Sequence, residues 1–435
     1  MRLLPLMAAT FFMVSGGPYG IEDILEAGYR NGLILLLVLP LLWSLPTALM
    51  IGELASALPE DGGFYVWVRR AMGPFWGYQE AWLSLAASIF DMAVYPTLFV
   101  LYLGQLAPAW TAGWHGTACE LGLIAVCCAW NLMGAPAVGD GSVALSALLL
   151  APFAIVVAVA AWHGAHLASH GAWAAGGVKG SLSTALLVAM WNYMGWDNAS
   201  TVAREVENPQ RNYPRAMLVA AFSTVLIYVI PLAAMAWAGV APARFQTGSW
   251  AAVASAMAGG WLGVAIVAGG MIMGVGMFNA LMMSYARLPM VLAEDGMLPA
   301  ALARKNRHGV PWVAVLACAV GWGLALQFSF ERLISLDIIL YGASLILEFL
   351  ALLILRVREP ELERPFRAGS LAFAGLISAA PTLLLVYAAW VSRDERMGHM
   401  PALLLGALIA GVGPLLFLVS RTLRKRTSPV LVGGN

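Results

Sequence analysis

Charged side chains are scarce in this sequence. Asp, Glu, Lys and Arg make up 11% of its 435 residues and hydrophobic residues make up 61%. Soluble domains carry about 25% charged residues, so this composition predicts an integral membrane protein. The net charge is only +1, and the basic stripe that nucleic-acid binding needs is missing. We therefore expect the protein to contact membrane lipid and not to bind nucleic acid.

Cysteine is also rare, and the four cysteines do not suggest a disulfide framework. Cys119, Cys127, Cys128 and Cys318 lie in or beside apolar runs, without a CxxC pair or paired histidines. They are expected to be packing residues, with neither a disulfide nor a metal site. A phosphate-binding G-x-x-x-x-G-K-[ST] loop and a nucleophile–base pair are also missing. We expect no enzyme activity, no cofactor and no obligate protein partner.

Long apolar runs fill most of the chain and predict an all-α membrane protein of about twelve transmembrane helices. The expected segments are 3–27, 32–57, 76–106, 118–134, 142–163, 181–203, 213–240, 255–291, 311–327, 333–356, 371–391 and 401–420. Three quarters of the 24 Lys and Arg residues fall on the side of the N-terminus, which predicts a plasma or inner membrane protein with both termini cytoplasmic. On that side, we expect Glu53 to form an ion pair with Arg69 or Arg70.

Two of these segments, the first and the sixth, are interrupted. Residues 15–20 contain three glycines and a proline after an apolar run that is too short to cross a bilayer, and residues 191–198 interrupt the segment at 181–203. Paired breaks in corresponding positions point to a transporter substrate site. Their spacing predicts one domain, 1–435, with inverted five-helix repeats at 1–163 and 181–356 and two additional helices at 371–420.

Carboxylates inside the apolar segments are the strongest pointers to function, because each costs several kcal/mol to place in a membrane. Glu22 and Asp23 follow the first break, Asp91 lies in the third segment, and Asp197 lies in the second break. No Lys or Arg lies in the middle of a segment to pair with them. Such acids suit an amine-bearing substrate, a proton or both. Alternatively, they cap half-helices or bond backbone groups that the breaks free.

The breaks themselves offer binding groups. Free N–H groups near Gly16, Gly17 and Gly20 are candidates to bind a substrate carboxylate, and carbonyls at both breaks are candidates to bind an ammonium. Aromatic faces attract alkylammonium groups, although packing and interfacial anchoring explain most aromatic residues. The aromatic candidates are Tyr19, Tyr95, Trp191, Tyr193 and Trp196.

Motifs across nearly the whole chain resemble the plant-type polyamine uptake transporters, a branch of the amino acid–polyamine–organocation superfamily. They stand at 16–23, 43–46, 53–63, 73–80, 95–96, 191–197, 205–209, 296–299 and 347–349. The resemblance implies the LeuT-like five-plus-five inverted-repeat fold, secondary transport, and substrate binding between the first, third, sixth, eighth and tenth helices. It carries over Glu22, Asp91, Trp196 and Asp197 as polyamine-site candidates.

Two departures from that family bear on the substrate. Leu101 and Asn279 stand where plant members look to have acids, which favours a smaller substrate. We expect secondary transport by alternating access, as proton-coupled uptake of polyamines or cationic amino acids, with Glu22, Asp91 and Asp197 as the candidate proton carriers. A neutral amino acid symporter or exchanger is the alternative, and a sodium site that includes Ser284 stays open.

Overall fold

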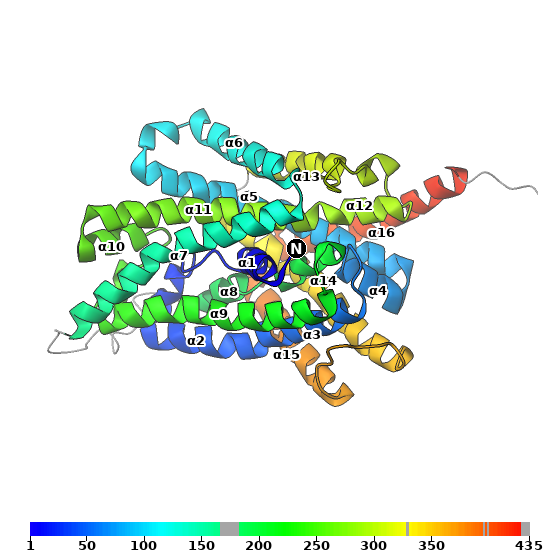
Figure 1. Ribbon diagram of the computed structural model, residues 1–435, viewed down its shortest axis with the longest axis horizontal. Coiled ribbons are helices and arrows are strands. Elements are labelled where there is room, and N and C mark those ends of the chain that lie inside the picture. Colours follow the sequence, from blue (N-terminus) through cyan, green and yellow to red (C-terminus); the bar gives the residue numbers. More distant parts are fainter. Residues whose placement is uncertain (166–181, 328–329, 395, 398–399, 428–435) are drawn as a thin grey trace, which may run out of the picture.

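The computed structural model describes residues 1–165, 182–327, 330–394, 396–397 and 400–427, and it is an all-α membrane protein (Figure 1). Its helices, in chain order, are α1 (Leu3–Val14), η1 (Glu22–Ala27), α2 (Tyr29–Leu42), α3 (Ser44–Ala57), α4 (Phe64–Met72), α5 (Pro74–Leu106), η2 (Pro108–Trp110), α6 (Trp114–Asn131), α7 (Ala135–Ala165), α8 (Leu182–Trp191), η4 (Trp196–Glu205), α9 (Pro209–Trp237), η5 (Pro242–Arg244), α10 (Trp250–Ala258), α11 (Gly260–Tyr285), α12 (Arg287–Glu294), η6 (Ala300–Ala303), α13 (Trp312–Ala325), α14 (Phe330–Arg358), α15 (Leu371–Val391), η7 (Ser392–Asp394) and α16 (Ala402–Thr427). Two short strands, β1 (Arg396–Met397) and β2 (Met400–Pro401), pair antiparallel.

Eight helices within the described ranges are long and apolar enough to cross a membrane. A helix satisfies its own backbone hydrogen bonds, which is why long apolar runs adopt this form in lipid. Burial separates central helices from peripheral ones. The most apolar window of α5 is 72% buried, whereas that of α16 is 22% buried and presents most of its surface outward. The twelve-span topology and the inverted repeat stay predictions.

Both interruptions that the sequence predicted are present. The first helix, α1, ends at Val14, and the chain then runs through Gly17 and Gly20, at φ of 77° and 78°, to the short 3-10 helix η1. A positive φ of this kind suits glycine, because other residues pay a steric penalty there. In the second interruption, α8 ends at Trp191 and η4 begins after Gly195, at φ of 91°.

The two interruptions touch each other. The Asn192 side chain donates a hydrogen bond of 3.0 Å to the Gly20 carbonyl oxygen. Gly195 lies against the end of α1, where an added Cβ would stand 2.3 Å from the Met13 carbonyl oxygen. Residues that are far apart in the sequence therefore meet at one place between α5, α9 and α11.

A third interruption was not predicted. The expected segment 32–57 is divided at Trp43 into α2 and α3. Trp43 lies three residues before Pro46. The Trp43 indole N–H donates to the Tyr193 carbonyl oxygen at 2.9 Å, which ties this bend to the second interruption. Proline has no N–H to donate and disfavours helical geometry just before it, so the bend has both a local and a tertiary cause.

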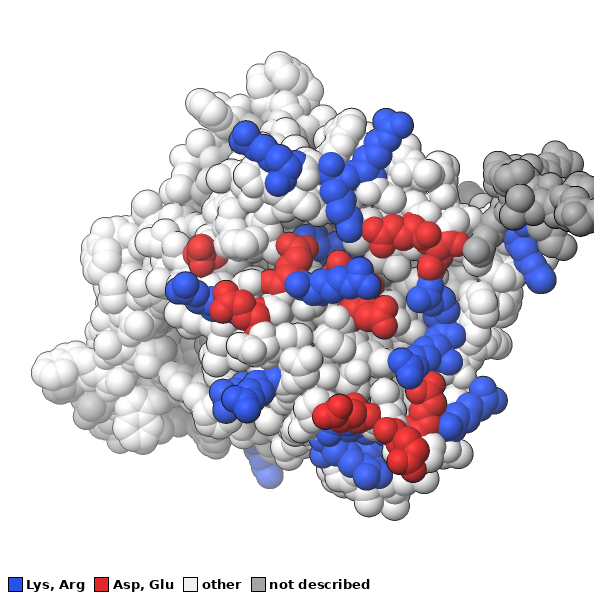
Figure 2. All heavy atoms as spheres, turned by 45° about the vertical axis from the view of Figure 1, so that its right-hand side comes forward, with Lys and Arg blue, Asp and Glu red and all other residues white. Residues whose placement is uncertain are grey.

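Charged side chains of both signs gather at the end of the helix bundle that Figure 2 turns toward the viewer. The expected pairing of Glu53 with Arg69 or Arg70 is wrong. Arg69 pairs with Asp295, and Arg70 donates to Glu359 across 2.6 Å. Glu53 instead lies in a buried cluster with two arginines near the end of α14, because α3 faces α14 and the connection that follows it.

Candidate functional site

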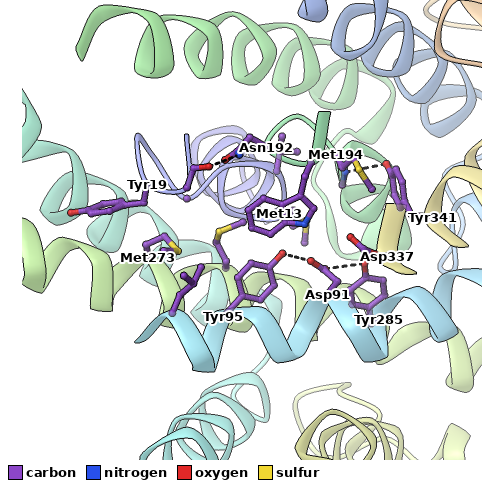
Figure 3. Close-up of a pocket in the computed structure, with 17 residues that line it drawn as sticks. Met13, Tyr19, Asp91, Tyr95, Asn192, Met194, Met273, Tyr285, Asp337 and Tyr341 are labelled. Atoms are coloured by element: carbon purple, nitrogen blue, oxygen red, sulfur yellow. Dashed lines mark hydrogen bonds between the residues drawn. The ribbon is translucent and has the colours of Figure 1, made fainter. Parts of the chain in front are cut away.

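A narrow cavity lies where the two interruptions meet (Figure 3). Its free volume is about 30 Å³, which is room for about two waters. Five parts of the chain supply its walls, namely the end of α1, α5, the α8–η4 break, α11 and α14. The lining residues are Met13, Val14, Gly16, Tyr19, Gly20, Asp91, Tyr95, Leu98, Trp191, Asn192, Met194, Gly195, Met273, Met277, Tyr285, Asp337 and Tyr341.

Two carboxyl groups face this cavity from the neighbouring helices α5 and α14. Asp91 on α5 accepts hydrogen bonds from the Tyr95 hydroxyl at 2.5 Å and from the Tyr285 hydroxyl at 3.4 Å. Asp337 on α14 lines the same space, together with Trp191 from the end of α8. Both acids are buried, and none of the described lining residues is a lysine, arginine or histidine. The cavity is therefore a buried acidic site with aromatic donors and no basic partner.

A third acid, Asp197, stands one side chain behind the cavity wall. It lies in the first turn of η4 and is 1% exposed. The Tyr341 hydroxyl donates to Asp197 at 2.5 Å and accepts the Gly195 N–H at 3.0 Å. Since Tyr341 itself lines the cavity, it connects Asp197 to the space in which Asp91 and Asp337 lie.

The structure separates the predicted site residues into two groups. Six line the cavity: Gly16, Tyr19, Gly20, Asp91, Tyr95 and Trp191. Five do not: Gly17, Glu22, Tyr193, Trp196 and Asp197. The first group comes from the first interruption, from α5 and from the end of α8, and its role in substrate binding stays a prediction.

Tyr19 and Gly17 show how the first interruption is held. The Tyr19 hydroxyl donates to the Ile266 carbonyl oxygen at 2.6 Å, so only the body of its ring borders the cavity. Gly17 faces α7, where an added Cβ would stand 2.5 Å from a methyl group of Leu149. A larger residue at Gly17 would therefore collide with packed side chains before it could affect a ligand.

Glu22 lies away from the cavity and against the loop that precedes α10. One of its oxygens accepts the Gly248 N–H at 3.1 Å, while its neighbour Asp23 accepts the Thr247 hydroxyl at 2.6 Å. The other Glu22 oxygen, Oε2, is buried without a hydrogen-bond partner among the described residues. Through these hydrogen bonds, Glu22 and Asp23 hold the loop before α10 against η1.

The two remaining aromatic candidates pack the second interruption from behind. Tyr193 donates its hydroxyl to the Leu36 carbonyl oxygen at 2.9 Å and packs edge to face against Tyr228. Trp196 is completely buried, and its indole N–H has no hydrogen-bond partner in the described part of the chain. Both side chains therefore support the break and do not face the cavity.

Several lining residues were missed by sequence reasoning. Asp337 had a clear signal, because it is an acid inside an apolar segment, the same criterion that selected Asp91. Tyr285 and Tyr341 had no such signal, since which tyrosines face a cavity depends on how each helix is rotated. Met273 and Met277 likewise resemble ordinary core residues until α11 is placed beside the first break.

The two departures from the plant-type pattern lie outside the cavity. Leu101 is 43% exposed on the outer part of α5. Asn279 is buried against α6, where it accepts a hydrogen bond of 2.6 Å from the Asn131 side chain. Neither position lines the cavity, and the expectation of a smaller substrate stays a prediction.

Ser284 belongs to a separate polar network. It donates to the Asn198 side-chain oxygen at 2.9 Å and accepts the Thr201 hydroxyl at 3.0 Å. The described residues contain no group of three or more His, Cys, Asp or Glu side chains that could hold a metal ion. Hydroxyl and amide oxygens are ligands for hard cations, so sodium at Ser284 stays a prediction.

Comparisons with known proteins agree with the resemblance. The family model "Amino acid permease" matches residues 7–412. The polyamine transporter PUT1 of Oryza sativa subsp. japonica is 34% identical over 396 residues, which cover 88% of this chain and 72% of that protein. The polyamine transporter RMV1 of Arabidopsis thaliana is 32% identical, over 94% of this chain and 84% of its own length. The serine/threonine exchanger SteT of Bacillus subtilis (strain 168) is 25% identical over 82% of each chain.

Proposed function

The chain belongs to the amino acid permease family, and on that premise we propose that it is a secondary transporter that takes up polyamines or cationic amino acids together with protons. Family membership and the apolar helices make it an integral membrane transport protein. Two plant relatives at 34% and 32% identity are polyamine transporters by name, which supports an amine as the substrate.

The observation that carries the proposal is the acidic cavity. Asp91 and Asp337 face one buried space, and no basic side chain lines it among the described residues. Two buried carboxylates without a counter-ion are costly, and a bound cation removes that cost. A diamine such as putrescine supplies two ammonium groups, one for each acid. The Tyr95 ring and the indole of Trp191 add aromatic surface of the kind that attracts alkylammonium groups.

The size of the cavity supports movement during transport. A free volume of about 30 Å³ is too small for a diamine. Binding therefore requires the two interruptions to separate from α5, α11 and α14. We infer alternating access, in which the inverted repeats at 1–163 and 181–356 move against each other and the termini lie in the cytoplasm.

The coupling proton is assigned to the acids around the cavity. Asp91 and Asp197 are favoured over Glu22, because Glu22 lies apart from the cavity and bonds the Gly248 backbone. An ammonium that binds beside Asp91 favours the ionised form of that carboxyl, so a proton that travels with the substrate is held by another acid of the site. Exchange of one amine for another needs no net proton movement and uses the same site.

Transport by purified protein in liposomes tests this function. The vesicles hold an alkaline interior, and uptake of labelled putrescine is measured with and without unlabelled competitors. Spermidine, arginine and a set of neutral amino acids are compared at equal concentration. We expect competition by the cationic compounds only. Competition by neutral amino acids, with none by amines, would support the neutral amino acid alternative and overturn the proposal.

A further inference from the structure

Helix α5 carries a buried polar face below the cavity. Its members recur at helical spacing, with Glu80, Ser84, Ser88 and Asp91 on one side of the helix. The Ser84 hydroxyl donates to one oxygen of Glu80 at 2.9 Å. All four side chains are buried, and Glu80 is fully buried. An acid therefore lies about three turns away from Asp91, deep in the protein and outside the cavity lining.

Helix α14 repeats this arrangement. Asp337, Tyr341, Ser344 and Glu348 follow one another at intervals of three or four residues, which places them on one face. The Ser344 hydroxyl donates to the Tyr341 carbonyl oxygen at 2.9 Å. All four are buried, and Glu348 is fully buried. This face runs from the cavity toward the arginine cluster at the end of α14.

The two polar faces are aligned with each other. Glu80 and Asp91 are separated by 11 positions, as are Asp337 and Glu348, which is about 16 Å of axial rise in an α-helix. Asp91 and Asp337 line the same cavity, α5 packs against α14, and the Arg70–Glu359 ion pair joins the residues just before α5 to those just after α14. The two helices are therefore antiparallel neighbours that bring a pair of aspartates together at the cavity and a pair of glutamates together at the second level.

Asp197 lies between the two levels. It accepts a hydrogen bond from Tyr341, which lines the cavity. On α14, Tyr341 lies about one turn after Asp337 and about two turns before Glu348. A continuous series of acids therefore leads from the substrate cavity, through Asp197, to the glutamate pair.

The glutamate pair has unsatisfied oxygens. Neither oxygen of Glu348 has a hydrogen-bond partner among the described residues, and Oε2 of Glu80 also has none. A fully buried carboxylate without a partner costs several kcal/mol, and such a group takes up a proton or a cation. The described residues hold no group of acids arranged for a metal ion, which leaves the proton as the ligand that fits.

We propose that the Glu80–Glu348 pair is a proton-binding site, which holds a proton on Glu348 and exchanges it with Asp197. Glu348 is the holder because Glu80 already receives the Ser84 hydroxyl, whereas Glu348 receives nothing. The inference rests on the proposed function, because it says where the coupling proton resides while a cation occupies the cavity.

The exchange is a simple proton transfer. No hydrogen bond joins Glu348 and Asp197 in this conformation, so the transfer requires the two carboxyls to approach each other. The O–H bond of Glu348 then breaks, its electron pair stays on that carboxylate, and the proton forms a new O–H bond on Asp197. The total charge of the acids does not change. An ammonium bound at the cavity favours ionised Asp197 and so returns the proton to Glu348. Release of the substrate reverses that preference.

The groups around Glu348 do not supply a permanent counter-ion. Asp197 faces it from η4, Glu80 faces it from α5, and Tyr341 lies two turns away on α14 itself. Glu53, on the neighbouring α3, is held by Arg356 and Arg364.

The remaining neighbours are also committed or uncharged. Arg69 and Arg70 on α4 pair with Asp295 and Glu359, respectively. Helix α15 carries no charged residue, and the basic residues of α16 lie in its last two turns. Glu348 therefore has no ion pair with a basic side chain in the described part of the chain.

Infrared difference spectroscopy tests whether the proton is there. Full-length wild type, Glu348→Gln and a matched control, Glu359→Gln, are compared in lipid. Glu359 is a partly exposed acid that is paired with Arg70, so its loss should not affect a protonated carboxyl. We expect a protonated-acid C=O band in wild type and in the control, and loss of that band in Glu348→Gln. A band that persists in Glu348→Gln overturns the proposal.

Transport by the same proteins tests its role. The membrane potential is clamped, and putrescine accumulation is measured with and without a gradient of one pH unit, which can support about tenfold accumulation for each coupled proton. Glu348→Gln should lose this response, with less than a twofold difference between the two conditions. Exchange of internal for external putrescine should stay within twofold of wild type. Glu80→Gln should show the same pattern in weaker form.

These measurements distinguish failure of the proton-binding site from failure of the proposed transport function. A full gradient response in Glu348→Gln overturns the role of the pair. Loss of both exchange and putrescine binding in that variant also overturns it, because the pair would then be part of the substrate site. If wild type keeps the infrared band but neither binds nor exchanges an amine, the proposed function fails while the proton site stands.

Discussion

Removing the negative charge of Glu53 should strongly destabilise the protein. Glu53 is fully buried on α3 and accepts hydrogen bonds from Arg356 Nε at 2.9 Å and from the Ala368 N–H at 2.8 Å. Arg364 Nε lies 3.2 Å from Oε1, the Glu53 oxygen that also accepts the Arg356 Nε–H. Arg356 is itself buried and also donates to the Ser370 carbonyl oxygen at 2.8 Å. One carboxylate therefore joins α3 to the connection between α14 and α15.

The magnitude follows from burial. Removal of one partner from a buried ion pair costs about 3–5 kcal/mol, because the remaining charge stays buried without compensation. Glu53→Gln keeps one acceptor oxygen, so we expect the lower end of that range. Glu359→Gln breaks the partly exposed pair with Arg70, and such pairs contribute about 0.2–1 kcal/mol. The two variants should therefore differ by at least about 2 kcal/mol.

The assay is thermal unfolding of both variants in one detergent at one pH. Because the entropy of unfolding grows with chain length, 1 kcal/mol shifts the melting temperature of a 435-residue chain by about 1 °C, and Glu53→Gln should melt about 2 °C or more below Glu359→Gln. Adding Arg356→Met to Glu53→Gln should recover part of the loss, since one uncompensated charge is then removed. Equal melting temperatures for Glu53→Gln and Glu359→Gln would refute the reasoning.

Two further predictions concern a glycine and a surface ion pair. Gly195→Ala should cost at least about 2 kcal/mol, because its Cβ would meet the Met13 carbonyl oxygen at a positive φ. Gly122→Ala in α6 meets open space and should be neutral or gain up to about 1 kcal/mol; similar melting temperatures for the two variants would contradict this. Hydrogen bonds from Arg70 hold the pKa of Glu359 below its ordinary value, so that pair stabilises the fold above the unfolded-state pKa of about 4.3 and loses its effect as the pH falls through the lower folded-state pKa. Arg70→Gln should therefore flatten the acid side of a plot of melting temperature against pH, and an unchanged slope would count against this pairing.

Local chemistry explains which parts of the fold were predictable. Residues 15–20 combine glycines with proline, so the end of α1 at Val14 follows from the sequence itself. The bend at Trp43 has a weaker local signal, and its indole is held by the carbonyl of Tyr193, far away in the chain. A contact of that kind exists only after the helices have packed, which is why the segment 32–57 was expected to be continuous.

The candidate site was predictable in its location and less so in its details. Acids within apolar segments indicated Asp91 and Asp197, and the same criterion applies to Asp337. The criterion does not reveal which way each side chain points. Glu22 satisfies it equally well and yet faces a loop, because the rotation of η1 is set by its contact with Gly248. Tyr341, which links Asp197 to the cavity, has no distinguishing sequence feature.

The partners in ion pairs were also not predictable from the sequence. Glu53 stands close in sequence to Arg69 and Arg70, so proximity along the chain favoured them as partners. The observed partner, Arg356, is about three hundred positions away. Pairing between distant helices depends on their order in the bundle, which hydropathy alone does not give.

The most direct test of the central claim is putrescine binding to wild type and to Asp337→Asn, measured as a thermal shift over a range of concentrations. A ligand of the native state stabilises it by about 2.7 kcal/mol at 100 times its Kd, so weak binding is visible at millimolar concentration. Loss of a buried charge partner costs about 2 kcal/mol or more, which raises Kd by about thirtyfold or more. The exposed acid Asp140 on α7 provides the control, and Asp140→Asn should leave Kd unchanged. The account predicts that Asp337→Asn binds putrescine more weakly than wild type, whereas Asp140→Asn binds it as wild type does. An unchanged Kd in that variant, or stabilisation of wild type by neutral amino acids and not by putrescine, would contradict it.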